Sequence, residues 1–188
     1  MQLGKITTFF SEHNLNILRL VLSAADKDDK IHRTIAYLEG DREYVNNMCK
    51  ELEKVENVVK ALQQIAAYKR SLYAIPVIGI TGSVGKTTTK DMLFSVMDKI
   101  SPTLKTQGNF NNEIGVPLTA FRLETEKIGI FEMGMSHFGE IEYLSNIVKP
   151  DIAVITNIGH SHIENLGSRE GILKAKLEVV KGMSKDSV

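Results

Sequence analysis

The sequence is poor in three features that mark whole classes of protein. It has one cysteine, Cys49, among 188 residues, so it can form neither an internal disulfide nor a cysteine metal cluster, which suits a reducing cytosol. Its 23 basic residues balance its 23 acidic residues, so the net charge does not indicate general electrostatic binding to nucleic acid. The longest apolar run near the N-terminus, ILRLVL, is broken by Arg19 and is too short for a membrane span, and no cleavable signal pattern precedes it. We therefore expect a cytoplasmic protein of one ordinary domain plus an appendage, with no nucleic-acid or membrane partner.

Glycine and proline are absent between Asp41 and Tyr73, where apolar residues recur every three or four positions. This spacing predicts one long amphipathic helix, or two in tandem, whose apolar stripe packs on the domain that follows or binds a partner. Upstream, four apolar residues follow a Ser11 cap at helical spacing: Leu15, Leu18, Val21 and Leu22. Residues 1–54 are therefore predicted to be a helical segment, to which we assign no role.

After Pro76 the pattern changes to short runs rich in β-branched residues. PVIGIT, KIGIF and DIAVIT lack a clean apolar and polar alternation, as is expected of strands buried on both faces, and PTLKT predicts a further short strand. Helices are predicted between and after these strands, over residues 87–100, 112–121, 138–148 and 168–182. The alternation of strands and helices predicts an α/β fold in which helices flank a parallel sheet.

The first of these strands runs into a glycine-rich turn, GITGSVGKTTTK, at residues 79–90. Glycines let backbone N–H groups turn around an anion, and the N-terminus of the following helix adds its dipole. Lys86 supplies a positive charge, and Thr87 offers a hydroxyl group to Mg²⁺. We expect a P-loop NTPase-like fold whose loop binds nucleotide phosphates through the consecutive residues Gly82, Ser83, Val84, Gly85, Lys86, Thr87 and Thr88. The common pattern G-x-x-x-x-G-K-[ST] differs at one position, where this chain has Ile80.

Two alternatives to a phosphate loop remain open. Gly79, Gly82 and Gly85 could begin a dinucleotide site, although their spacing is G-x-x-G-x-x-G and PTLKT ends without the acidic residue that would bind a ribose. The turn could also be a plain link between strand and helix. A plain link would not explain a lysine followed by three threonines.

Polar residues follow two other predicted strands. KIGIF leads to Glu132, and DIAVIT leads to Asn157, His160 and His162. Ligands of parallel α/β sheets bind beyond the carboxyl ends of the strands, where a carboxylate and an imidazole could ligate a divalent metal that bridges phosphates. Taken singly, the glutamate could be a helix-entry cap and the histidines solvated loop residues.

Four segments together resemble the ATP-binding central domain of the Mur ligases, enzymes of peptidoglycan precursor synthesis. They are GITGSVGKTTTKDML, TQGNFNNEIGVPLTAF, FEMGMSHFGEIEYL and DIAVITNIGHSHIENLGSREGILKAKLEV. The resemblance runs from about Val55 to the end of the chain and is strongest to the branch that adds D-alanyl-D-alanine. The family's loop has the form T-G-x-x-G-K-[ST], which accommodates Ile80.

The resemblance implies roles for the residues around the phosphate loop. Lys86 would hold the β- and γ-phosphates of ATP and act in catalysis. Thr87 and Glu132 would ligate Mg²⁺, while His162 would act as the ligand of a second metal ion. His160 would support the site from behind or belong to a subgroup of the family.

The resemblance also implies roles for a lysine and an asparagine. Lys176, in KAKLEV, matches a catalytic lysine that CO₂ converts into a carbamate, which requires a neutral amine and therefore a lowered pKa. Asn112 would lie near the nucleotide phosphates, although Asn109 and Asn111 are close enough to leave the register open.

The implied reaction is ATP-dependent amide bond formation between UDP-N-acetylmuramoyl-peptide and D-alanyl-D-alanine, through an acyl phosphate. Residues 1–54 do not resemble the N-terminal module of the family. From the resemblance we expect residues 55–188 to be a central domain that is truncated at its C-terminal end. The truncation would leave an exposed sheet edge prone to self-association. The alternatives are a non-catalytic nucleotide-binding or interaction module, and a fragment of a folylpolyglutamate-synthase-like ligase.

Overall fold

The computed structural model describes the backbone of residues 16–24, 31–39 and 58–188, and side chains from residue 59 onward. The first two ranges are strands β1 (Asn16–Ala24) and β2 (Ile31–Glu39), which pair antiparallel as a two-stranded sheet. The predicted helix over residues 16–24 is therefore wrong, as is the α-helical N-terminal segment where the structure describes it. A short apolar run does not distinguish a strand from a helix by periodicity, and here pairing with a second apolar segment decides the conformation.

Helix α3 (Val58–Ser71) is the described part of the long helix predicted from the stretch without glycine or proline. The remainder of that prediction, residues 41–57, lies outside the described residues, as does the Ser11 cap. The buried apolar side chains of α3 recur every three or four positions: Ala61, Leu62, Ile65 and Ala66. They pack α3 against α5 and α6, which confirms that this part of the stripe faces the domain.

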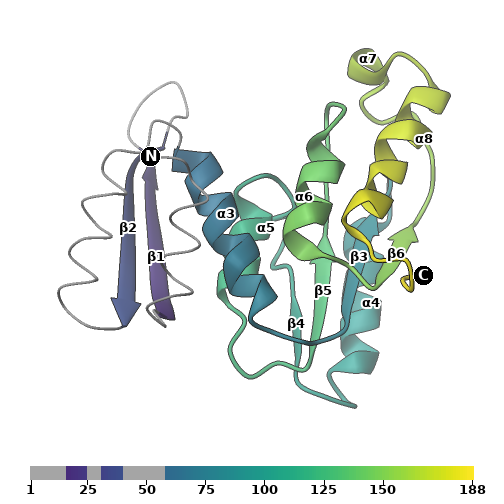
Figure 1. Cartoon of the computed structure of the whole chain (residues 1–188). Helices are drawn as coiled ribbons and strands as arrows, with labels where there is room; N and C mark the ends of the chain where they lie inside the picture. Colours follow the sequence, from purple (N-terminus) through teal and green to yellow (C-terminus); the bar gives the residue numbers. More distant parts are fainter. Residues whose placement is uncertain (1–15, 25–30, 40–57) are drawn as a thin grey trace.

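The central sheet has four parallel strands in the order β4-β5-β3-β6 (Figure 1). Their bounds are Val77–Thr81 for β3, Thr103–Lys105 for β4, Ile128–Glu132 for β5 and Ile152–Ile155 for β6. All four strands were predicted from sequence. In the register of the sheet, Ile80 lies opposite both Glu132 and Val154, so the strands reach their carboxyl ends together.

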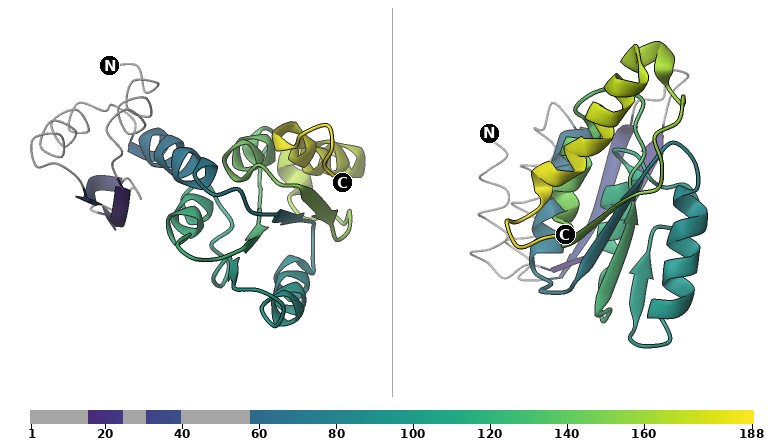
Figure 2. Two further views of the ribbon diagram at one scale, coloured as in Figure 1. Left: turned by 60° about the horizontal axis from the view of Figure 1, so that its bottom comes forward. Right: turned by 90° about the vertical axis from the view of Figure 1, so that its right-hand side faces the viewer.

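Helices cover both faces of this sheet, as Figure 2 shows. Their bounds are Lys86–Met97 for α4, Gly115–Phe121 for α5, Glu140–Val148 for α6, Ile163–Leu166 for α7 and Arg169–Leu177 for α8, which continues as the 3₁₀ helix η1 (Glu178–Gly182). The four predicted helices are present, although α5 starts three residues later than predicted. Only the short α7 has no counterpart among the predictions for this part of the chain.

Alternate residues of the strands enter two separate cores because successive side chains point to opposite faces of a sheet. Val77 and Phe131 join the larger core with α3, α5, α6 and α8. Ile78, Ile80 and Ile130 join a smaller core under α4. This burial on both faces explains why the strands read as continuous apolar runs. None of the helices in the described ranges is long and apolar enough to cross a bilayer.

Candidate nucleotide-binding site

The first residue of the loop between β3 and α4 has no room for a side chain, so the loop requires glycine there. Gly82 has φ of +148°, and a Cβ atom there would lie 1.9 Å from Oγ1 of Thr156 at the end of β6. That hydroxyl donates to the carbonyl oxygen of Val84 at 2.6 Å, so the two strand ends are joined across the loop. The loop therefore owes its shape to the neighbouring strand as well as to its own glycines.

Asn157 fixes the loop from the same strand end. Its Oδ1 atom accepts hydrogen bonds from the backbone N–H groups of Ser83 and Val84, at 3.1 and 3.0 Å. The Oγ atom of Ser83 in turn accepts from the N–H of Gly159 at 2.9 Å. The first turn of α4, from Lys86, presents further backbone N–H groups that have no acceptor within the helix. This arrangement suits an anion at the helix N-terminus.

The side chain of Lys86 lies across the loop, where its Nζ atom donates to the carbonyl oxygen of Gly82 at 2.8 Å. The next residue points to the adjacent strand: Oγ1 of Thr87 donates to Oε1 of Glu132 at 3.2 Å. The predicted cation and the two predicted metal ligands therefore lie at one edge of the sheet.

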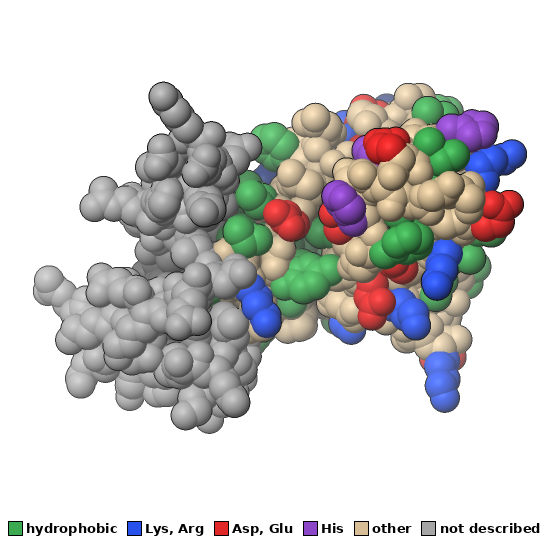
Figure 3. Space-filling view, turned by 90° about the horizontal axis from the view of Figure 1, so that it is seen from above, with side chains coloured by type: hydrophobic (Ala, Val, Ile, Leu, Met, Phe, Trp, Pro, Cys, Tyr) green, Lys and Arg blue, Asp and Glu red, His purple; other side chains and the backbone are tan. Residues whose placement is uncertain are grey.

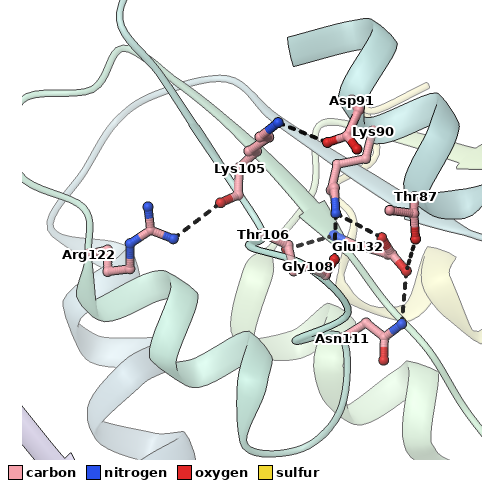
Figure 4. Close-up of polar contacts among 9 residues, drawn as sticks. All are labelled: Thr87, Lys90, Asp91, Lys105, Thr106, Gly108, Asn111, Arg122 and Glu132. Atoms are coloured by element: carbon pink, nitrogen blue, oxygen red, sulfur yellow. Dashed lines mark hydrogen bonds and ion pairs between the residues drawn. The ribbon is translucent and has the colours of Figure 1, made fainter.

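Glu132 is buried, with 1% of its surface exposed, and it is the centre of a polar network (Figure 4). Its Oε1 atom also accepts from Nδ2 of Asn111 at 2.8 Å, and its Oε2 atom forms an ion pair with Nζ of Lys90 at 3.2 Å. Its backbone N–H donates to Oγ1 of Thr106 at 3.0 Å. A buried carboxylate is tolerated when it is paired and hydrogen-bonded in this way.

Lys90 was not predicted as a site residue from the sequence, although its position in the helix offers a signal. It falls at the helical spacing of the residues by which α4 covers the sheet, Leu93, Phe94 and Met97. A lysine at such a position needs a buried partner, and the glutamate at the end of the neighbouring strand is that partner.

The paired oxygens of Thr87 and Glu132 fit Mg²⁺, which prefers hard oxygen ligands and is commonly held by one or two protein groups together with phosphates and water. The part of the chain with described side chains holds no cluster of three or more His, Cys, Asp or Glu residues that could bind a metal ion by itself.

Two asparagines of the loop before α5 make different contacts within the protein. Asn111 reaches Glu132, as described above. Oδ1 of Asn112 accepts from the N–H groups of Ile114 and Gly115, at 3.2 and 2.8 Å, and so caps α5. Both asparagines also line the cavity described next.

A cavity of about 910 Å³ opens beyond the carboxyl ends of the strands. Its walls include the predicted residues Gly82, Ser83, Lys86, Asn112, His162 and Lys176. His162 has a left-handed backbone, with φ of 61°, and precedes α7, whereas His160 is exposed and lies outside the cavity lining. Figure 3 looks down on this face, where histidine, acidic and basic side chains are interspersed rather than gathered in one patch.

Lys176 projects from α8 into the same cavity, with 2% of its surface exposed. Burial and, to a lesser extent, the positive charge of Lys86 together lower its pKa from 10.5 to about 8. Both effects disfavour a second ammonium group at this site. The lowered pKa brings deprotonation of the Lys176 amine closer to neutral pH.

Residues 80–188 match the family model described as the Mur ligase middle domain. The UDP-N-acetylmuramoyl-tripeptide–D-alanyl-D-alanine ligase of Bacillus subtilis is 54% identical over 136 residues, which are 71% of this chain and 30% of that protein. The chain therefore spans about 30% of the length of this curated relative.

Two solved structures have the same fold over the same part of the chain. MurF of Acinetobacter baumannii is 44% identical with a TM-score of 0.67, and the similarity covers 71% of this chain and 30% of that one. The MurF ligase of Thermotoga maritima, solved in complex with ADP, is 39% identical with a TM-score of 0.67, over 70% of this chain and 31% of that one. Because the family model covers more than half of its residues and these relatives share its sheet, the chain belongs to the Mur ligase family.

Proposed function

We propose that the chain is the nucleotide-binding part of a ligase that joins D-alanyl-D-alanine to a UDP-N-acetylmuramoyl-peptide with the use of ATP. The observation that carries this proposal is the cluster of polar groups at the carboxyl edge of the sheet. There the ammonium of Lys86 donates to the carbonyl oxygen of Gly82, and the hydroxyl of Thr87 donates to the carboxylate of Glu132. The named relatives supply the substrates of the proposal.

The proposed reaction has two steps. The γ-phosphoryl group passes from ATP to an oxygen of the substrate carboxylate, so that the bond to ADP breaks and an acyl phosphate forms. The amine of the dipeptide then attacks the carbonyl carbon, loses a proton and expels phosphate. The protein contributes mainly position and fixed charge, as in other phosphoryl transfers.

Lys86 and the N-terminus of α4 would hold the phosphates. The Lys86 ammonium is within 2.8 Å of a loop carbonyl oxygen, from which it can turn onto the charge that develops on the γ-phosphate. Thr87 and Glu132 would hold Mg²⁺, which supplies neutralisation of phosphate charge when it is bound. His162 would hold a second metal ion at the wall of the same cavity.

Lys176 would complete the site as a carbamate. A neutral amine adds to CO₂ and releases one proton, so a buried cation becomes an anion that can face a metal ion. The lowered pKa supports this step, because at pH 7 about one amine in ten is neutral, against roughly one in three thousand for an ordinary lysine.

Three wider features belong to the same proposal. We place a domain boundary near residue 55, because α3 packs on α5 and α6 as part of the α/β unit. We place the reaction in the cytoplasm, where ATP is available.

Finally, we propose that the chain can self-associate through the outer edge of β6, the end strand of the sheet, where Ile152 is 43% exposed.

Calorimetric titration of the 188-residue chain with Mg-ATP tests the proposal. Lys86→Ala should weaken ATP binding at least about tenfold, since it removes a charge-assisted contact to phosphate. Lys174→Ala, which changes an exposed lysine of α8, should bind ATP like the wild type. Equal affinities in wild type and Lys86→Ala would refute the phosphate site.

A second measurement separates a ligase from a nucleotide-binding module. Phosphate release is followed after UDP-N-acetylmuramoyl-tripeptide and D-alanyl-D-alanine are added with ATP. Release that needs both substrates supports ligation by this chain. ATP binding without such release would assign the chain the binding step alone.

A further inference from the structure

Lys90 is a buried cation that the proposed mechanism does not use. Its surface is 1% exposed, although a lysine side chain is almost never fully buried unless it is paired. Its Nζ atom makes two contacts, with the carbonyl oxygen of Gly108 at 2.7 Å and with Oε2 of Glu132 at 3.2 Å. It lies four residues after Lys86, which is about one turn further along α4.

The two oxygens of the Glu132 carboxylate have different partners. Oε1 receives the hydroxyl of Thr87 and the amide of Asn111, whereas Oε2 receives the ammonium of Lys90 (Figure 4). A carboxylate is planar, so a contact that holds one oxygen also sets the direction of the other. Lys90 thereby directs Oε1 toward the hydroxyl that would share the metal ion.

Lys90 also joins the carboxylate to the loop that carries Asn111. Gly108 belongs to the segment between β4 and α5. The hydrogen bond from Lys90 to its carbonyl oxygen is shorter than the contact of Lys90 with Glu132. The loop, helix α4 and strand β5 therefore meet at one ammonium group. Because the ammonium has two fixed acceptors, it is held in place without a metal ion.

We propose that Lys90 is a positioning residue for the metal ligand Glu132, an inference that rests on the proposed function. Its ammonium fixes the rotation of the carboxylate so that Oε1 stays beside the Thr87 hydroxyl, and it anchors the loop at Gly108 to the same point. Groups that orient a metal ligand commonly change metal affinity by about 10–100-fold when they are removed.

A purely structural ion pair would have a different signature. Such a pair would affect folding and leave the dependence of ATP binding on Mg²⁺ unchanged. Lys105 provides the matched control, because it too forms an ion pair that involves α4. Its partner is Asp91, at 2.8 Å, and this pair lies at the surface.

The experiment uses the whole chain and three variants: Lys90→Met, Lys90→Arg and Lys105→Met. Thermal unfolding first establishes that each variant is folded. Calorimetry then gives the affinity for ATP in EDTA and at a series of Mg²⁺ concentrations, from which the Mg²⁺ midpoint is read.

In Lys90→Met we expect ATP binding in EDTA to stay within about twofold of the wild type, since the loop is intact, while the Mg²⁺ midpoint rises about tenfold or more. In Lys90→Arg, which keeps the charge but not the geometry, we expect a rise of about threefold. Lys105→Met should keep the wild-type midpoint.

A folded Lys90→Met protein with the wild-type midpoint would overturn the proposal. Should Lys90→Met fail to fold, an unchanged midpoint in Lys90→Arg would overturn it, because charge alone would then suffice. Absence of ATP binding by the wild type would instead refute the proposed function, so the two failures are distinguishable.

Discussion

At the scale of single residues, the site contains two buried lysines that differ in what they face. Lys90 faces the carboxylate of Glu132, whereas Lys176 faces the positive charge of Lys86. Burial and then the like charge of Lys86 lower the pKa of Lys176, which suits a reactive amine, whereas Lys90 forms an ion pair with a carboxylate. Sequence resemblance predicted a role for Lys176, whereas Lys90 draws attention only through its partner Glu132, which lies 42 residues away in the chain.

The lowered pKa of Lys176 leads to a prediction about its reaction with CO₂. At a fixed pressure of ¹³C-labelled CO₂, a carbamate signal in the NMR spectrum should grow as the pH rises from 6 toward about 8, because the fraction of neutral amine grows. Lys176→Met should lose this signal, and Lys174→Met, on the exposed side of the same helix, should retain it. A signal of equal size in wild type and Lys176→Met would assign the reaction to another amine.

At the scale of elements, β3, its loop and α4 form the unit that the sequence predicts best. A buried strand, a glycine turn and a helix start follow one another within the chain, so their order needs no information from elsewhere. The loop's detailed shape does, because Thr156 and Asn157 hold it from β6. The opposite case is β1, where an apolar segment suited either conformation and pairing with β2 made it a strand.

The close approach at Gly82 gives a prediction for this unit. Gly82→Ala places a Cβ against Thr156, so the loop must move and both ATP affinity and stability should fall. We expect a loss of at least about tenfold in affinity and about 1–3 kcal/mol in the free energy of unfolding. Calorimetry and urea denaturation measure the two effects.

Gly167→Ala is the control for backbone strain alone. Gly167 also has a positive φ, of +79°, but its Cβ would meet no atom within 4 Å. We expect a loss of about 1–2 kcal/mol in stability from the left-handed backbone and unchanged ATP affinity. A loss of ATP affinity as large as that of Gly82→Ala would contradict the steric explanation.

At the scale of the whole molecule, the two edge strands of the central sheet are protected to different degrees. β4 is short and carries Lys105, whose charge is a common device against edge-to-edge pairing. β6 has the sequence IAVI, without a charged residue, and its burial is incomplete along its length. Its outer side meets only a short stretch of the described chain, where Val188 accepts from Ala153 and donates to Asp151, each at 2.8 Å.

This difference predicts which edge mediates self-association. The wild-type chain should show concentration-dependent association in sedimentation velocity, and Ile152→Lys should shift it toward monomer, because a charge on an edge strand opposes pairing. Leu72→Lys changes a similarly exposed apolar residue, at 54% exposure, that follows α3 and is not part of β6, and this variant should associate like the wild type. A monomeric wild type at high concentration would exclude this interface.

The sequence by itself determined the order of the α/β elements and the glycine-rich loop between β3 and α4, because these depend on local spacing: glycines at a turn, a lysine at a helix start and apolar runs of strand length. Its resemblance to the family also predicted Glu132, His162 and Lys176 as site residues, and these roles stay predictions. Only the tertiary structure decided which side chains share the site. The parallel register brings Glu132 to Thr87 and Lys90, while helix packing buries Lys176 beside Lys86. Distances between elements and the burial that shifts a pKa arise from packing, which no local pattern encodes.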